Sequence, residues 1–347
     1  MIIMFQQYLQ RVIDNKSLTE KEAEHAMSLI MDGNITASQI ASFITVLRFR
    51  GETVEEMLGF TKAMRTKMKK IEFNHPNVID TCGTGGDSAS TFNISTAAAI
   101  VASSGGAKVA KHGNRAFTSK SGSADVLEQL QIPVQQTTED VKTALHTKGM
   151  AFLFAPNYHE GMKHAVQPRK EIGFRTIFNI LGPLANPVQC KNQVIGVFSK
   201  TYAEKMAQVL VKLKASHVLL VCGEDGLDEF SITGKSHVLE VKNGQLHKFS
   251  VEPEEVGLRR HSLQDIQVRN SLESAQTIQQ AFQLKASEAV IDTIAYNAGA
   301  ALYVSNLAKS MMEGIYQAKQ LLKNGDALRQ LQLLKQERGQ FHASANH

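Results

Sequence analysis

Four polar segments, three of which contain glycine, lie between residues 80 and 125 and carry groups suited to binding phosphate. They read Asp-Thr-Cys-Gly-Thr-Gly-Gly-Asp at 80–87, Thr-Phe-Asn-Ile-Ser-Thr at 91–96, Lys-His-Gly-Asn-Arg at 111–115 and Ser-Gly-Ser-Ala-Asp at 121–125. The glycines follow the apolar pair 78–79, typical of a buried strand end, and they leave backbone N–H groups uncovered there. Asn93, Ser95 or Thr96 can begin an alanine-rich helix, whose N-terminus favours phosphate. Together the segments predict a site for a highly phosphorylated ligand.

Each segment alone has a simpler interpretation. A Gly-Thr-Gly-Gly run is most often a tight turn, a single lysine is usually solvated, and hydroxyls before an alanine run are usually helix caps. The Rossmann and Walker glycine patterns are both missing from this region. Only the combination favours phosphate binding. The predicted groups are Asn93, Ser95, Thr96, Lys111 and the backbone N–H groups of Gly83, Gly85 and Gly86.

An acidic pair offers ligands for a metal ion. Asp228 and Glu229 end the turn Gly-Leu-Asp-Glu at 226–229. Magnesium prefers oxygen ligands and keeps several waters, so two carboxylates beside a bound phosphate suit it. The Ser95 hydroxyl is a further candidate ligand on the phosphate side. An Asp-Glu pair in a turn is also typical of a solvated surface, so the pair alone leaves both interpretations open.

The combination of segments resembles the anthranilate phosphoribosyltransferases, a family of the nucleoside phosphorylase-like phosphoribosyltransferase class. Residues 80–87, 91–96, 111–115 and 121–128 match it, as do 169–187, 226–229 and 297–303 further along the chain. The resemblance implies transfer of the phosphoribosyl group of 5-phosphoribosyl 1-diphosphate to the anthranilate amine, in tryptophan biosynthesis. It also implies two Mg2+ ions and a homodimer formed through a helical domain.

The resemblance gives five residues a role toward the aromatic acceptor. Arg169 is at the position that takes the anthranilate carboxylate, which suits the two-point geometry of a guanidinium. Asn114 matches an asparagine that faces the amine, and His112 and His159 line the acceptor's path beside Gly83. Either histidine is equally well explained as an ordinary hydrogen-bonded interior residue.

On the diphosphate side the resemblance adds three residues to those named above. Asp87 matches a position near the ribose and the pyrophosphate, and Thr91 and Ser123 belong to matching segments. Asp228 and Glu229 match the acids of the second magnesium. The implied catalytic residues are Lys111, Asn114 and Arg169. Because an anilinic amine is already neutral at pH 7, we expect positioning and electrostatic stabilisation of the departing pyrophosphate to dominate catalysis.

Residues 1–70 predict a unit of four short helices. Three helix starts are marked by capping boxes, in which Thr19 pairs with Glu22, Thr36 with Gln39, and Thr53 with Glu56. Such a unit is too small to bury its apolar faces alone, so it must pack on the rest of the chain or on a second copy. The basic residues between 62 and 70 favour a solvated helix end over a nucleic-acid-binding arm.

The remainder of the chain alternates short apolar runs with helical patterns. Strands are predicted at 78–79, 108–110, 151–154, 194–198 and 218–221, and a hairpin at 237–251 around Asn243-Gly244. Helices are predicted near 96–104, 124–130, 139–148, 203–213, 286–307 and 311–333. The alternation indicates a mainly parallel sheet covered by helices, and ligands bind beyond the carboxyl ends of such strands.

The fold class that follows is α/β, with a small all-helical domain and a larger α/β domain. We expect residues 1–70 to form the helical domain, which the resemblance completes with about 162–187. Residues 71–161 and 188–347 then form the large domain that carries the diphosphate site. The chain departs from the family at Ser88 and at Gln167-Pro168, and residues 259–290 follow it only loosely.

Composition narrows the class of protein further. A net charge of +5 is compatible with anionic substrates but low for a nucleic-acid-binding protein. The 3 cysteines form no CxxC pair, which argues against a disulfide framework or zinc site and for a reducing compartment. We expect no signal peptide, no membrane span and a cytoplasmic location. The alternatives are a pyrimidine nucleoside phosphorylase and a non-catalytic paralogue that binds nucleic acid.

Overall fold

The predicted capping boxes start three of the four N-terminal helices. In the computed structural model, which describes residues 2–86, 89–116 and 121–335, these are α1 (Ile2–Ile13), α2 (Glu20–Met31), α3 (Ala37–Arg50) and α4 (Val54–Lys67). Thr19, Thr36 and Thr53 each accept the N–H of the residue three positions on, and that residue's side chain accepts the threonine N–H. These boxes are therefore confirmed.

Seven strands form one sheet in the order β3-β2-β1-β4-β5-β6-β7. They are β1 (Val78–Gly83), β2 (Lys108–Gly113), β3 (Met150–Phe154), β4 (Asn192–Gly196), β5 (His217–Gly223), β6 (Ser236–Lys242) and β7 (Gln245–Val251). The first five are parallel, whereas β6 and β7 form the predicted antiparallel hairpin. Its turn has positive φ at both Asn243 and Gly244, as a tight hairpin requires. The carboxyl ends of β1 to β5 therefore meet at one edge.

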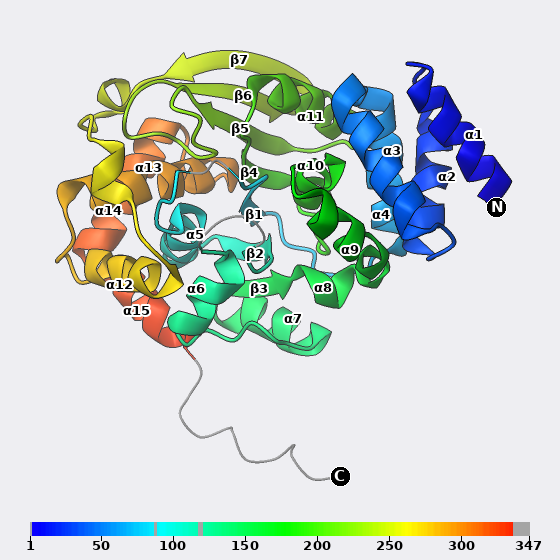
Figure 1. Cartoon of the computed structure of the whole chain (residues 1–347). Helices are drawn as coiled ribbons and strands as arrows, with labels where there is room; N and C mark the ends of the chain where they lie inside the picture. Colours follow the sequence, from blue (N-terminus) through cyan, green and yellow to red (C-terminus); the bar gives the residue numbers. More distant parts are fainter. Residues whose placement is uncertain (1, 87–88, 117–120, 336–347) are drawn as a thin grey trace, which may run out of the picture.

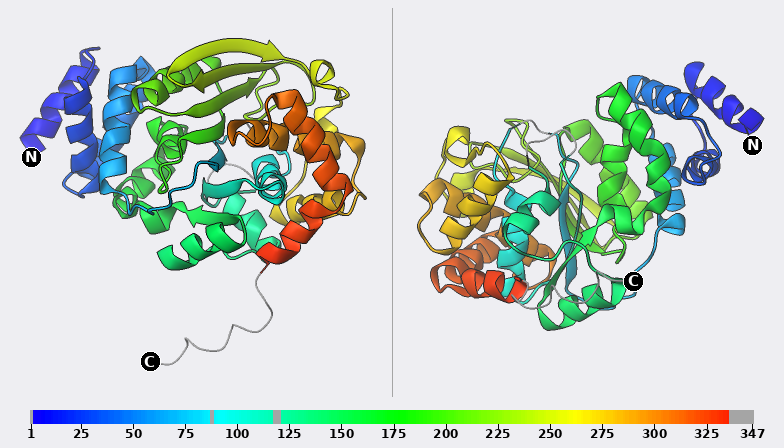
Figure 2. Two further views of the ribbon diagram at one scale, coloured as in Figure 1. Left: turned by 180° about the vertical axis from the view of Figure 1, so that it is seen from behind. Right: turned by 60° about the horizontal axis from the view of Figure 1, so that its bottom comes forward.

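Helices cover both faces of the sheet (Figure 1). They are α5 (Ile94–Ser104), α6 (Ser123–Gln129), α7 (Thr138–Thr147), α8 (Ala155–Tyr158), α9 (Lys163–Ile172), α10 (Ile177–Leu184), α11 (Lys200–Lys212), α12 (Ser271–Phe282), α13 (Glu288–Val304), α14 (Met311–Lys323) and α15 (Asp326–Leu334). Short 3-10 turns lie at Glu160–Met162, Pro253–Val256 and Leu263–Ile266. Helices α5 and α13 pack on one face and α11 on the other. Figure 2 shows α1–α4 and α12–α15 at opposite ends of the molecule.

Four features differ from the elements expected from the sequence, the first being that β1 continues from Ile79 through Gly83. Residues 311–333 form two helices, α14 and α15, because the chain turns at Gly325, whose φ is 75°. Helix α12 lies within the loosely matching 259–290 region and was not predicted. Strand β2 continues beyond its predicted end, so that Lys111 and His112 lie inside the strand and are buried.

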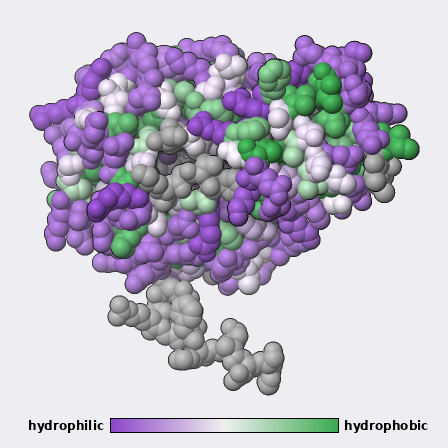
Figure 3. All heavy atoms as spheres, in the orientation of Figure 1, coloured by the Kyte–Doolittle hydropathy of each residue, from purple (hydrophilic) through white to green (hydrophobic). Residues whose placement is uncertain are grey.

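The helical bundle packs against parts of the chain that are distant in sequence. Helix α9 contacts α2 and α3, and α10 contacts α3 and α4, while α11 also lies against α4. On the face shown in Figure 3, hydrophobic residues gather toward the end of the molecule that holds the bundle and α9. All three basic residues of α4 bind acceptors within the chain. Lys62 pairs with Glu20, Lys67 with Asp32, and Arg65 donates to the Leu184 carbonyl.

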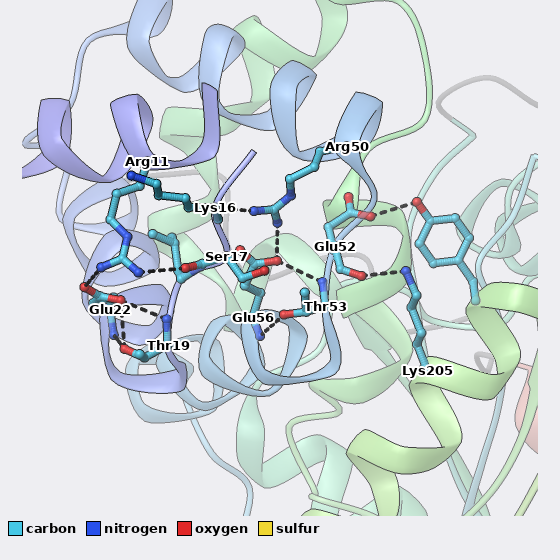
Figure 4. Close-up of polar contacts among 12 residues, drawn as sticks. Arg11, Lys16, Ser17, Thr19, Glu22, Arg50, Glu52, Thr53, Glu56 and Lys205 are labelled. Carbon is cyan, nitrogen blue, oxygen red and sulfur yellow. Dashed lines mark hydrogen bonds and ion pairs between the residues drawn. The ribbon is translucent and has the colours of Figure 1, made fainter. Parts of the chain in front are cut away.

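A polar cluster joins the α3–α4 turn to α11. Figure 4 shows Glu52 on this turn, with its carboxylate bound to the hydroxyl of Tyr202 and its backbone carbonyl bound to Lys205. Tyr202 Oη donates to Glu52 Oε2 over 2.8 Å, and Lys205 Nζ donates to the Glu52 carbonyl over 2.6 Å. Burial raises the pKa of the Glu52 carboxyl. The bundle is therefore joined to α11 by a buried and a partly buried hydrogen bond as well as by apolar packing.

Candidate active site

A cavity of about 490 Å³ opens at the carboxyl edge of the parallel strands. It collects nearly all of the predicted site residues from seven separate parts of the chain. Those on its wall are Gly83, Gly85, Gly86, Thr91, Asn93, Ser95, Lys111, His112, Asn114, Ser123, His159, Arg169, Asp228 and Glu229. Asp87 and Ser88 lie outside the described residues. The cavity volume is large enough for a drug-sized ligand or two small substrates.

The loop after β1 is shaped by bonds to β4 and to the acidic turn. The Thr84 N–H donates to the Gly196 carbonyl over 2.9 Å, and the Gly85 N–H donates to Asp228 Oδ2 over 2.8 Å. Gly85 and Gly86 have φ values of 69° and 79°, a backbone conformation that favours glycine. The Gly85 N–H was expected to face a phosphate, and in this structure it is bound to a carboxylate oxygen instead.

The N-terminus of α5 forms the next part of the wall. Asn93 is its N-cap, and Asn93 Oδ1 accepts the Thr96 N–H over 3.3 Å. The Asn93 N–H in turn donates to Ser274 Oγ of α12 over 2.8 Å. Thr96 is completely buried, and its hydroxyl donates to Asn93 rather than into the cavity. The structure therefore brings Thr91, Asn93 and Ser95 to the cavity, but it places Thr96 behind the wall.

Lys111 reaches the cavity from within the sheet. Its Nζ donates to the Thr81 carbonyl over 2.6 Å and to Ser95 Oγ over 3.0 Å. Because an ammonium group has three donors, these two bonds leave one for a ligand. Burial lowers the pKa of Lys111, and the negative charge of nearby Asp80 opposes that shift. Lys111 thus places a positive charge directly behind the Ser95 hydroxyl.

Asp80 is the buried partner that orients this part of the sheet. Its Oδ1 accepts the His112 N–H over 3.1 Å, and its Oδ2 accepts from Asn186 Nδ2 over 2.8 Å. Burial raises the pKa of the Asp80 carboxyl, while the Asn186 bond favours the ionised form. Asp80 does not line the cavity. It therefore acts on the site through the strand that carries Lys111.

The rings of His112 and His159 are neighbours on the cavity wall. The ring centroids of His112 and His159 are 5.2 Å apart. Burial lowers the pKa of His112 to about 3, helped by the neighbouring ring, and burial lowers the pKa of His159 to about 4. Both rings are therefore neutral at pH 7.

Arg169 and Asn114 also line the cavity. The Arg169 guanidinium lies 5.3 Å from the centroid of the Phe178 ring of α10. Burial lowers the pKa of Arg169 to about 10, which leaves it charged at pH 7. Asn114 Oδ1 accepts the Arg115 N–H over 2.8 Å, which directs the amide NH2 group of Asn114 away from its own backbone. Pro168 lies inside α9 and does not end the helix before Arg169.

The acidic pair sits where the glycine loop, β4 and β5 converge. Asp228 is buried, Glu229 is partly buried, and both line the cavity. A Cβ at Gly83 would lie 2.8 Å from Asp228 Oδ2, so a larger residue there would displace this carboxylate. Among the described residues, no cluster of three or more His, Cys, Asp or Glu could hold a metal. Two carboxylates and the Ser95 hydroxyl nevertheless fit magnesium, which binds through few protein oxygens, waters and phosphate.

Sequence reasoning missed Arg175, which holds the glycine loop, and Val268, which lies on the cavity wall. Arg175 lies between α9 and α10, donates to the Gly86 carbonyl, and stacks 4.5 Å from the Phe198 ring centroid. Val268 lines the cavity because the segment after the 3-10 turn Leu263–Ile266 runs beside Ser90 and Thr91. Gln267 forms a β-bridge with Thr91, and the Val268 N–H donates to the Ser90 carbonyl. Arg175 was visible inside the 169–187 block, whereas Val268 carries no local signal.

Comparison with known proteins gives the class. Residues 75–328 match the a/b domain of a glycosyl transferase family, and residues 6–68 match the helical bundle domain of that family. Both parts of a glycosyl transferase of this type are thus present, in the arrangement described above. Within the described ranges, none of the helices combines the length and the apolar character that a membrane crossing requires.

Relatives along the whole chain give the particular family. The anthranilate phosphoribosyltransferase of Geobacillus sp. (strain WCH70) is 53% identical over 98% of this chain and 100% of its own length. That of Bacillus subtilis (strain 168) is 48% identical, covering 97% of this chain and 99% of the relative. The chain therefore belongs to the anthranilate phosphoribosyltransferase family.

Solved structures agree with this assignment. The Thermus thermophilus anthranilate phosphoribosyltransferase superimposes with a TM-score of 0.87 at 36% identity, covering 94% of this chain and 99% of its own. The Saccharomyces cerevisiae enzyme in complex with PRPP and Mg superimposes with a TM-score of 0.86 at 29% identity, covering 95% and 96%. The expected fold class, with a helical bundle and a larger α/β unit, is confirmed. The phosphorylase and nucleic-acid-binding alternatives are not favoured.

Proposed function

We propose that this enzyme transfers the phosphoribosyl group of 5-phosphoribosyl 1-diphosphate to the amine of anthranilate. The products are N-(5-phosphoribosyl)anthranilate and pyrophosphate, in tryptophan biosynthesis. The observation that carries the proposal is that two unlike sets of residues line one cavity. The glycine loop, Lys111 and the acidic pair suit a diphosphate, and the Arg169 side suits an aromatic carboxylate. Relatives with the same domains carry this name.

The acceptor side binds and orients anthranilate. The Arg169 guanidinium, held against Phe178, binds the carboxylate in two-point geometry. The amide of Asn114 faces the amine and directs its lone pair at C1. His112 and His159 are neutral at pH 7, so they supply flat, uncharged surfaces that do not compete with Arg169 for the carboxylate.

The donor side stabilises the charge that grows on the leaving pyrophosphate. The N-terminus of α5 with the Ser95 hydroxyl lies here beside the loop Gly83 to Gly86, whose Gly85 N–H is bound to Asp228 in this structure, and Lys111 adds a positive charge behind Ser95. Since these groups are already positioned, they cost little reorganisation when the C1–O bond breaks. The amine nitrogen forms the new bond to C1 from the opposite face as the pyrophosphate leaves, and it then loses a proton.

Magnesium fits this donor side. The Saccharomyces cerevisiae enzyme has been solved in complex with PRPP and Mg, and a variant of it with Mg bound. We propose two ions, with Asp228 and Glu229 holding one and the Ser95 hydroxyl contributing to the other. When bound, magnesium neutralises phosphate charge and so favours departure of the diphosphate. The bond from the Gly85 N–H to Asp228 Oδ2 supports this assignment, because it brings the acid to the loop where the diphosphate is expected.

The division into domains and the assembly belong to the same proposal. Residues 1–70 with about 162–187 form the helical domain, supported by the packing of α9 and α10 on α2–α4. Residues 71–161 and 188–347 form the large domain. A homodimer through the helical domain is supported by exposed apolar side chains on α1 and α3, where Ile3 is 73% and Phe49 is 92% exposed. A cytoplasmic location is supported by three free, buried cysteines.

A turnover assay tests the function. Purified protein with magnesium and 5-phosphoribosyl 1-diphosphate should abolish the fluorescence of anthranilate and release one pyrophosphate for each anthranilate consumed. The matched control is the double variant Asp228→Asn with Glu229→Gln, which keeps the shape of the turn but removes both charges. Unchanged anthranilate, together with phosphorolysis of thymidine, would establish the phosphorylase activity instead.

A further inference from the structure

The acidic turn is held from behind by a side chain that does not line the cavity. Asn297 of α13 is buried, and its Oδ1 accepts the Phe230 N–H over 3.0 Å. Its Nδ2 donates to the Phe230 carbonyl over 3.2 Å and to the Thr293 carbonyl over 3.0 Å. A single amide therefore pairs with both backbone groups of the residue that follows Glu229.

These bonds fix the backbone next to Glu229 and so influence the orientation of both acids. The Phe230 nitrogen belongs to the peptide bond that leaves Glu229, so a bond to its N–H sets the plane of that peptide. The bond to the Phe230 carbonyl sets the plane of the next peptide. The Phe230 ring is also fully buried, 5.0 Å from the ring of Tyr296, the neighbour of Asn297 in α13. The backbone after Glu229 is thus tied to α13 at three points.

The other end of the turn has its own anchors. The Gly223 N–H donates to the Leu227 carbonyl over 2.8 Å, and the Leu227 N–H donates to Asp225 Oδ1 over 3.0 Å. Between these anchors and Asn297 lie only Asp228 and Glu229. Asparagine suits its position because its amide offers an acceptor and donors side by side, which aspartate, alanine or leucine cannot do.

We propose that Asn297 is a positioning residue for the magnesium-binding acids. It holds the backbone beside Glu229 so that both carboxylates stay directed at the metal and the diphosphate, although it touches neither. The inference rests on the proposed function of Asp228 and Glu229. Removal of an outer partner of a metal ligand typically weakens metal affinity about 10–100-fold, and we expect an effect of this size.

The test is a binding titration with Mn2+ followed by electron paramagnetic resonance, in the presence of 5-phosphoribosyl 1-diphosphate and without anthranilate. Free Mn2+ with the sugar diphosphate alone provides the baseline. The variants are Asn297→Ala and Asn297→Asp; the second keeps the shape of the side chain and the acceptor for the Phe230 N–H. The matched control is Thr293→Val, one turn earlier in α13, where a buried hydroxyl bonded to the Ala289 carbonyl is removed.

The proposal predicts Mn2+ affinity at least about tenfold weaker in the folded Asn297 variants, with affinity of Thr293→Val close to that of the wild type. Binding of anthranilate alone should be unchanged. If a folded Asn297 variant binds Mn2+ as the wild type does, or if Thr293→Val loses as much affinity, the positioning role is wrong. Wild-type protein that binds no Mn2+ and turns over no anthranilate would instead count against the proposed function.

Discussion

Gly196 at the end of β4 is the position where the smallest change should disturb the site most. Its carbonyl accepts the Thr84 N–H of the glycine loop over 2.9 Å. On its other side the backbone of Asp228 passes so closely that a Cβ on residue 196 would lie 1.5 Å from the Asp228 carbonyl oxygen and 2.6 Å from the carbonyl carbon. The single methyl group of Gly196→Ala therefore collides with backbone, which cannot swing aside as a side chain can.

The size of the expected effect follows from this geometry. Non-bonded heavy atoms pack at about 3.5–4 Å, so the acidic turn has to move by roughly 2 Å. A displacement of about 1 Å in positioning groups can cost about 100-fold in rate, so we expect kcat/KM to fall at least about 100-fold. The magnesium concentration for half-maximal rate should rise as well. Forced overpacking also costs about 1–3 kcal/mol in the free energy of unfolding.

The assay is the initial rate of anthranilate fluorescence loss at several magnesium concentrations, with thermal unfolding measured in parallel. Gly234→Ala is the matched control, because the nearest atom to a Cβ there is Arg260 Nη1 at 3.9 Å, an ordinary contact. We expect this control to keep wild-type activity. A folded Gly196→Ala enzyme with wild-type kcat/KM and magnesium dependence would refute the argument that the acidic turn must lie against β4.

Three further variants test other parts of the site. Arg169→Ala should raise the KM for anthranilate far more than that for the diphosphate substrate, and equal increases in steady-state assays would count against its carboxylate-binding role. Arg175→Ala removes the donor to the Gly86 carbonyl, so it should raise the diphosphate KM about tenfold and leave anthranilate binding unchanged by fluorescence titration. Because burial lowers the pKa of His112 from 6.5 to about 3, the unfolded state binds more protons in that window, and stability falls as the pH falls. His112→Gln should therefore reduce the slope of the free energy of unfolding against pH between pH 6.5 and 4, by up to about 1.4 kcal/mol per pH unit. An unchanged slope in thermal unfolding measurements would argue against a buried neutral ring.

Features with short-range causes could be predicted from the sequence. The capping boxes at Thr19, Thr36 and Thr53 involve residues three positions apart, and each was found as expected. The Asn243-Gly244 hairpin likewise depends on two residues that adopt positive φ. The glycine loop was singled out by its residue types and the acidic pair by the resemblance, and the parallel sheet explains why both reach one edge.

Features that depend on distant partners could not be predicted in this way. Lys111 looked like a residue beyond a strand end, since a lysine seldom belongs in a buried strand. Inside the sheet it is accommodated by the Thr81 carbonyl and Ser95 Oγ, which are not adjacent to it in sequence. The same reason hid the bond from Arg175 to Gly86 and the pairing of Asn297 with Phe230. Thr96 was predicted to bind phosphate but is buried and bonded to Asn93. A capping hydroxyl and a ligand-binding hydroxyl have the same local sequence pattern, so the sequence could not separate them.

The most direct test of the account is a crystal structure with 5-phosphoribosyl 1-diphosphate and magnesium bound. We predict the diphosphate against the loop of Gly83 to Gly86 and the N-terminus of α5, with a metal ion between it and the carboxylates of Asp228 and Glu229. A well-ordered diphosphate bound elsewhere, with the glycine loop empty and no metal beside the acidic pair, would contradict it.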